Sequence, residues 1–231
     1  MKSILFALLL LTAAAHAQQG ILDGAVYDMA GKKGTVLVFH GAGHTGLSWW
    51  QDSQKLAFVR ALAKDGFSYI CPQSRNARWW EYIDLSQSNA DLVSVTSLIR
   101  RLGARPPFFF VGHSHGGWFA AWFSLNSAYK PLVIQYSNHP GDSYREDFTL
   151  FGNPGYKAWS IFCYSSKDPE ILRIDPALIS ESIRFLQRRR IPVAAKDLHS
   201  QYLYLRIKYE HAFLNTATFT LPIFNQARNS Q

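Results

Sequence analysis

The sequence predicts an α/β protein, a three-layer α/β/α sandwich on a mostly parallel sheet. Short runs of Val, Ile and aromatic residues recur along the chain, and amphipathic helical patterns separate them. Strands that are apolar on both faces and alternate with helices are typical of a parallel sheet covered on both sides. At 231 residues, 48% of them hydrophobic, the chain is long enough for one well-filled core.

The strands are expected where the apolar runs are short, at residues 35–39, 67–71, 107–111, 132–136 and 159–164. The helices are expected between and after them, near residues 52–65, 89–102, 115–128 and 176–190. A period-two pattern, YLYLRIKY at residues 202–209, predicts one more strand. Functional loops of such sheets follow the carboxyl ends of the strands, so the strand exits are where chemistry is expected.

A serine lies at one of these exits, in GHSHG at residues 112–116. The motif follows a strand and opens a helix, as a nucleophile elbow does. Side chains two residues before and after Ser114 would collide in so sharp a turn, and both positions are glycine. The helix N-terminus beneath Ser114 offers backbone N–H groups to an oxyanion. A glycine-rich turn without chemistry is the alternative.

A second exit matches the first, because the strand at residues 35–39 runs into HGAG at residues 40–43. With HGAG after one strand and GHSHGG after another, the sequence resembles the α/β-hydrolase family, and the resemblance covers nearly all of the chain after residue 17. It implies a small, capless serine hydrolase without a cofactor. It also implies that the backbone N–H groups of Ala42 and His115 form the oxyanion hole.

The resemblance further implies a catalytic acid and a catalytic base, in the order Ser, Asp or Glu, His. Asp168, in SSKDP at a strand exit, is the first choice for the acid, and Asp142, in NHPGD, is the alternative. His211, in EHAFL after the period-two pattern, is the first choice for the base. The alternative is His199, whose surroundings KDLHSQY are more typical of a polar turn.

Further side chains near the two motifs are candidates for contact with substrate, with ordinary loop and packing roles as the alternative. These candidates are His40, His44, His113, Trp49 and Trp50. No metal is expected, because the histidines are scattered and neither an HExxH motif nor paired cysteines occur.

The first 17 residues resemble a signal peptide that is cleaved on export. Lys2 precedes the apolar run at residues 4–11, and Ala15-His16-Ala17 has the small-x-small pattern of a cleavage site. That run is shorter than the roughly 20 residues of a spanning helix, which disfavours a membrane anchor. Residues 18–231 are then expected to form one hydrolase domain of a soluble periplasmic or secreted protein. The sequence does not indicate an oligomeric state.

The formal net charge of +8 raises the question of an anionic partner. Arg100–Arg101 and Arg188–Arg190 fall at the ends of helical patterns, where cations complement the helix dipole. No nucleic acid partner is therefore expected, and weak attraction to anionic surfaces at low salt is the alternative.

Cys71 and Cys163 are expected to be free thiols, because the sheet order of the resembled family places three strands between them. Four strand spacings of about 4.8 Å separate such residues by roughly 19 Å. A disulfide needs Cα atoms within about 7 Å.

The expected function is hydrolysis of carboxylic esters through an acyl-enzyme, with a small-molecule or polymer-linked ester as the partner. The same constellation serves amidases, peptidases and acyltransferases, which stay open as alternatives. Outside enzymes, the alternative is a catalytically silent binding protein on the same scaffold. Residues 137–157 are rich in Gly, Pro, Asn and Asp, and this pattern predicts no cap over the site.

Overall fold

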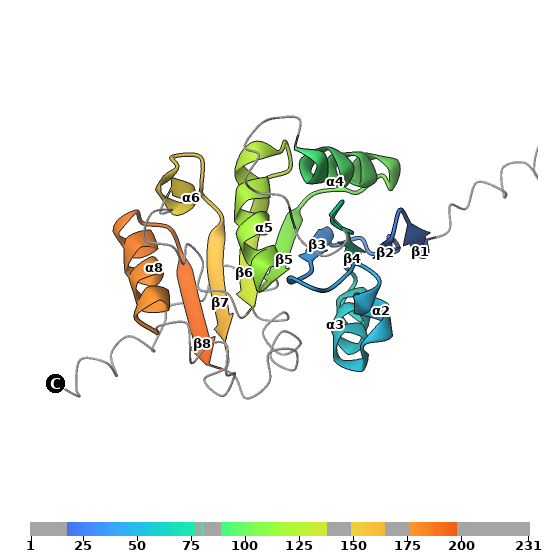
Figure 1. Cartoon of the computed structure of the whole chain (residues 1–231), viewed down its shortest axis with the longest axis horizontal. Helices are drawn as coiled ribbons and strands as arrows, with labels where there is room; N and C mark the ends of the chain where they lie inside the picture. The colour runs from blue at the N-terminus through green and yellow to red at the C-terminus, as the bar shows by residue number, and fades with distance from the viewer. Residues whose placement is uncertain (1–17, 77–79, 81–88, 138–148, 165–175, 198–231) are drawn as a thin grey trace, which may run out of the picture.

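The structure is a computed structural model, and it describes residues 18–76, 80, 89–137, 149–164 and 176–197. Through them runs an eight-stranded sheet of order β1-β2-β4-β3-β5-β6-β7-β8 (Figure 1). The six strands β4, β3, β5, β6, β7 and β8 pair with their neighbours in parallel. Strand β2 pairs antiparallel with both β1 and β4. The strands are β1 (Gln19–Leu22), β2 (Ala25–Asp28), β3 (Thr35–Phe39), β4 (Ser68–Cys71), β5 (Phe108–His113), β6 (Pro131–Ser137), β7 (Trp159–Tyr164) and β8 (Val193–Asp197).

The helices that connect these strands cover both faces of the sheet (Figure 1). They are α2 (Ser48–Gln51), α3 (Ser53–Lys64), α4 (Ala90–Arg101), α5 (His115–Asn126), α6 (Thr149–Gly152) and α8 (Pro176–Arg188). This arrangement confirms the predicted three-layer sandwich. Strands β3 to β7 and helices α3, α4, α5 and α8 agree with their predicted ranges to within two residues at each end.

Five of the described elements were not predicted, namely β1, β2, β8 and the short helices α2 and α6. The hairpin of β1 and β2 turns at Asp23 and Gly24, both with positive φ, at 52° and 78°. An Asp-Gly pair is the usual sequence of such a two-residue turn, so this signal was present in the sequence. The strand expected at residues 202–209 lies outside the described residues.

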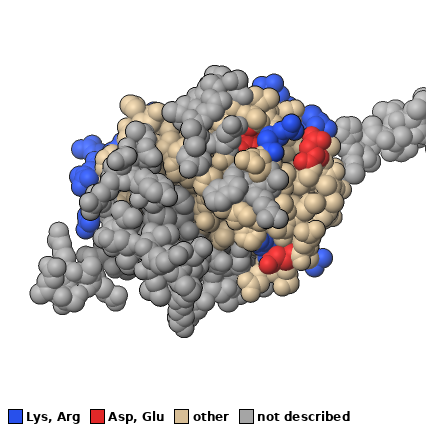
Figure 2. Space-filling view, in the orientation of Figure 1, with Lys and Arg blue, Asp and Glu red and all other residues tan. Residues whose placement is uncertain are grey.

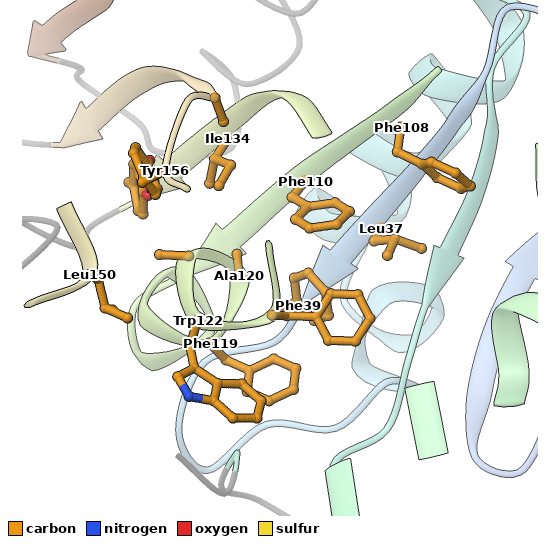
Figure 3. Packing of buried hydrophobic residues seen from close by; sticks show 14 of the residues in the cluster. Leu37, Phe39, Phe108, Phe110, Phe119, Ala120, Trp122, Ile134, Leu150 and Tyr156 are labelled. Atoms are coloured by element: carbon orange, nitrogen blue, oxygen red, sulfur yellow. The ribbon is translucent and has the colours of Figure 1, made fainter. Parts of the chain in front are cut away.

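Alternate residues of the central strands face two separate apolar clusters. In β3, Leu37 and Phe39 belong to the cluster that includes residues of α4, α5 and α8, whereas Val36 and Val38 belong to the cluster that includes residues of α2 and α3. The first cluster is rich in rings from β3, β5 and α5 (Figure 3), and Phe39 meets Phe110 and Phe119 edge to face. A period of two along buried parallel strands fills both layers, and it fixes the register that brings β3 and β5 side by side.

The arginine clusters lie at helix ends, as the sequence predicts. Arg100 and Arg101 occupy the last turn of α4, and Arg188 occupies the last turn of α8. Where Figure 2 shows described residues, Lys and Arg lie in separate groups and not in one continuous patch. This distribution fits a structural role at helix C-termini.

Both cysteines are free thiols in the structure, as predicted, and both are buried. The sheet order places β3, β5 and β6 between β4, which carries Cys71, and β7, which carries Cys163. Burial raises the pKa of the Cys71 thiol well above its ordinary value, so this thiol is unreactive in the folded protein. We expect a thiol titration of the denatured, unreduced protein to find two thiols per chain. A titration that finds none in a monomer would contradict the strand order.

The connection between β6 and β7 spans the position where a cap would be inserted. Its described residues form only the four-residue helix α6 and a turn, and residues 138–148 lie outside the description. No helix in the part of the chain that the structure describes is long and apolar enough to cross a membrane.

Candidate active site

Ser114 occupies the sharp turn between β5 and α5. Its backbone has φ 49° and ψ −124°, a conformation that residues other than glycine rarely adopt. The N–H of Ser114 donates to the carbonyl of Ser137 at the end of β6 (2.8 Å), and the carbonyl of Ser114 accepts from the N–H of Gly117 (2.8 Å). These bonds to a strand and to a helix hold the strained turn in place, as the predicted nucleophile elbow requires.

The two glycines that flank Ser114 are required by close backbone contacts. A Cβ atom at Gly112 would lie 2.3 Å from Cα of Gly117, and a Cβ atom at Gly116 would lie 2.5 Å from the carbonyl oxygen of His40. Neither contact can be relieved by rotating a side chain, because the opposing atoms belong to the backbone. The steric reason that the sequence indicated for both glycines is therefore confirmed.

The loop after β3 lies against this elbow. A Cβ atom at Gly41 would lie 2.7 Å from Nδ1 of His113 and 3.2 Å from Cβ of Ser114. The N–H of His44 donates to the carbonyl of Gly41 (3.2 Å), and Gly43 has φ 75°, so residues 41–44 form a tight turn. Ala42 is thus part of a turn whose first residue touches the elbow.

His115, the other predicted oxyanion donor, is the first residue of α5. The first N–H groups of a helix have no acceptor within the helix, and they carry the positive end of its dipole. The structure therefore brings together the two segments that were predicted to form the oxyanion hole.

His40 is buried beneath this loop, with 1% of its surface exposed. Its Nδ1 lies 2.9 Å from the carbonyl of Gly41, and its Nε2 accepts from the N–H of Ser74 (3.3 Å). Its own carbonyl accepts from the indole N–H of Trp80 (2.8 Å). Both ring nitrogens thus face the backbone, so His40 ties the loop after β3 to the loop after β4. The prediction that His40 contacts substrate finds no support in this geometry.

The buried ring of His40 makes the stability of the fold depend on pH. Burial lowers the pKa of His40 from 6.5 to about 4. Between these two pH values the ring is therefore protonated in the unfolded chain but neutral in the folded chain. The contribution of His40 to the free energy of unfolding is therefore fully present above pH 6.5. It decreases by about 3 kcal/mol as the pH falls toward 4. We expect urea denaturation of His40→Gln to show a weaker loss of stability between pH 7 and pH 4 than the parent. Equal losses in the two proteins would contradict this role.

The tryptophans predicted to line the site serve mainly the core. Trp49 is fully buried and packs against Phe58 of α3. Trp50 is half-buried, and its indole N–H donates to the hydroxyl of Tyr69 (3.0 Å). The packing alternative is therefore the better description of Trp49, whereas Trp50 remains partly accessible.

The three other histidines near the elbow differ in exposure. His113, in β5, is buried; His115 is half-buried; and His44 is exposed. The rings of His44 and His113 meet edge to face, with centroids 6.1 Å apart. Burial lowers the pKa of His115, which favours its neutral form at pH 7. Among the described residues, no three His, Cys, Asp or Glu side chains gather as metal ligands do.

The predicted acid and base lie outside the described residues. This holds for Asp168 and His211 and also for their alternatives, Asp142 and His199. The structure nevertheless adds one relevant element, since β8 pairs in parallel with β7 and ends at Asp197. His199 therefore follows a strand exit by two residues, a position that the sequence pattern did not indicate.

The family of this chain is identified by comparison with models of known protein families. The model of the alpha/beta hydrolase family matches residues 36–218, and the chain belongs to this family. A comparison with curated proteins found no match.

Solved structures share the fold at low sequence identity. A carboxylesterase from Mesorhizobium loti superposes with a TM-score of 0.60 at 12% identity, covering 86% of this chain and 99% of that one. A serine hydrolase without a lid from Xanthomonas campestris gives a TM-score of 0.56 at 15% identity, covering 85% and 94%. The capsule O-acetyltransferase of Neisseria meningitidis serogroup A gives 0.53 at 13% identity, also covering 85% and 94%.

Proposed function

We propose that this protein is a serine hydrolase that cleaves carboxylic esters through an acyl-enzyme, with Ser114 as the nucleophile. The observation that carries the proposal is the backbone of Ser114, held at φ 49° between β5 and α5. Strained backbone of this kind persists only where the surrounding structure enforces it, and it is common at active sites. The contact of Gly41 with the same turn supports the assignment.

In the proposed reaction, Oγ of Ser114 attacks the ester carbonyl carbon while a histidine takes its proton. The N–H groups of Ala42 and His115 stabilise the negative carbonyl oxygen of the tetrahedral intermediate. The histidine then returns the proton to the departing alcohol, and the acyl group stays on Ser114. A water molecule releases the acid by the same steps and regenerates the hydroxyl.

The histidine and its acid come from the segments beyond β7 in this proposal. Asp168 orients the base, with Asp142 as the alternative, and the base is His211. His199 is a stronger alternative than its sequence suggested, because β8 ends only two residues before it. An acid that accepts from Nδ1 of the base would hold the productive tautomer and stabilise the imidazolium.

Acyl transfer is the second candidate function, since one structure with the same fold is an O-acetyltransferase. We favour hydrolysis because the connection between β6 and β7 is short and its described part forms only α6 and a turn, so we expect water to reach the acyl-enzyme. An open site also favours short acyl groups, since it cannot enclose a long chain.

A series of aryl esters of increasing acyl length tests the open site. We expect kcat/KM to be highest for short acyl groups and to be unchanged by an oil–water interface. Adding an alcohol or a sugar as an acceptor should leave the released acid as the main product. Preference for long chains with interfacial activation, or acyl ester of the acceptor as the main product, would contradict this proposal.

Export is part of the proposal, with residues 1–17 removed as a signal peptide and residues 18–231 forming the mature domain. The support for it is the sequence pattern, in which Lys2 precedes an apolar run and Ala15-His16-Ala17 has the small-x-small form of a cleavage site. The intact mass of protein recovered from the periplasm or medium checks the cleavage point. We retain ester substrates, with no nucleic acid, metal or cofactor, as expectations.

A further inference from the structure

A buried lysine lies behind the loop that carries Ala42. Lys55, in the first turn of α3, is only 4% exposed, which is rare for a lysine. Its Nζ lies 3.3 Å from Nδ1 of His44 and 3.4 Å from Oγ of Ser48. The ammonium also lies 6.0 Å from the ring centre of Trp49, within the range of a cation–π contact. Lys55 forms no ion pair with any carboxylate of the described residues.

The partners of Lys55 set the direction of these hydrogen bonds. The hydroxyl of Ser48 donates its proton to the carbonyl of Thr45 (2.6 Å), so it can only accept from Lys55. An ammonium has three donors and no acceptor, so Nδ1 of His44 must also accept. An imidazole that accepts at Nδ1 carries its single proton on Nε2. The contact with Lys55 therefore selects one neutral tautomer of His44.

The charged groups around His44 favour the same neutral state. Lys55 faces it from α3 and Asp52 from the N-cap of that helix, His113 faces it from β5, and His40 precedes its loop. Burial and then the charge of Lys55 lower the pKa of His44, and the carboxylate of Asp52 partly opposes them. The ring is thus neutral at pH 7.

His44 is well placed to meet a ligand of the elbow. Its side chain is exposed, and it ends the turn whose first residue, Gly41, touches Ser114. Because Nδ1 faces the buried ammonium, the opposite edge of the ring, with Nε2, faces away from Lys55. In this tautomer the Nε2 edge of the ring carries the N–H donor.

We propose that Lys55 is a positioning residue that holds His44 as the neutral Nε2–H tautomer, so that His44 donates a hydrogen bond to an acceptor oxygen of the bound ester. The role in substrate binding rests on the proposed function, whereas the state of His44 does not. Lys55 itself touches no substrate and acts through the ring of His44.

NMR of the histidine side chains in the full chain tests the tautomer directly, with His44→Gln used to assign the signal. We expect His44 to carry its proton on Nε2 at pH 7.5 and to titrate below 6.5. In Lys55→Met the two tautomers should mix and the pKa should rise, whereas Lys55→Gln, whose amide still donates, should keep the Nε2–H form. Lys64→Met, which changes an exposed lysine of the same helix, is the matched control and should alter nothing.

A proton on Nδ1 of His44 in the parent protein would overturn the proposal, and so would an unchanged tautomer in Lys55→Met. The measurement on the parent does not depend on Lys55→Met, so it decides the question even if that variant fails to fold.

A double-mutant cycle then tests whether Lys55 acts through His44. We expect His44→Ala and Lys55→Met each to lower kcat/KM about tenfold, mainly by raising KM, and the double variant to lose no more than His44→Ala alone. Additive losses would overturn the coupling. Failure of Ser114 to react with a fluorophosphonate would contradict the proposed function instead, and it would leave the NMR result standing.

Discussion

Replacing Ser114 with alanine should abolish ester turnover and leave the fold intact. The substitution removes the attacking oxygen, and loss of a catalytic nucleophile lowers kcat/KM by about 10³-fold or more. The backbone should not change, because alanine has the same Cβ atom that serine already carries at φ 49°. Initial rates with a short aryl ester measure the loss, and urea denaturation confirms folding.

Ser124→Ala is the matched control, since Ser124 lies on the helix that follows the elbow and its hydroxyl donates to the carbonyl of Ala121 (2.6 Å). This variant should keep its activity, with at most about 1 kcal/mol less stability. Full activity in Ser114→Ala would rule out this nucleophile and with it the proposed mechanism.

Removing the catalytic histidine should cost about three orders of magnitude in rate or more, and only one histidine of the C-terminal region can be that base. We expect His211→Ala to be inactive and His199→Ala to be nearly normal. The reason is that His211 stands in EHAFL after a strand pattern, as the base of an α/β hydrolase does. Turnover of the two variants across pH 5 to 9 measures the difference.

If His199 and not His211 is the base, a different strand delivers the catalytic histidine. An inactive His199→Ala with a nearly normal His211→Ala would make β8 the strand whose exit delivers the base. Loss of activity in both variants calls for a folding check by urea denaturation, because only the base should be inactive while folded. Two active variants would contradict a triad with a C-terminal histidine.

The central strands and the elbow could be predicted because burial on both faces leaves a continuous apolar run. PFFFV and TVLVF are such runs, and the glycines beyond them signal close backbone contacts. Strand β8, the last strand of the sheet in the described part of the chain, reads VAAKD, a mixture of small and charged residues without a period of two. Its pairing with β7 depends on the sheet already present, which local sequence does not encode.

Side-chain roles at the site were harder to predict than its backbone. His40 follows directly on β3 and was expected to face substrate, but its ring turns inward and bonds to the loops on both sides. The contact of Lys55 with His44 could not be predicted from the sequence, because the helical pattern of α3 does not distinguish a lysine that extends into solvent from one that extends toward His44. Such contacts join residues of different elements, so only the fold defines them.

Covalent labelling with a fluorophosphonate, followed by mass spectrometry of the digested protein, shows directly whether Ser114 is the nucleophile. We expect one adduct per chain, on the peptide that contains Ser114, at a rate that falls when the catalytic histidine is removed. Ser114→Ala should take up no label, and Ser124→Ala should be labelled as the parent is. An adduct on another residue, or no adduct on the folded parent protein, would contradict the claim that this elbow is the active site of a serine hydrolase.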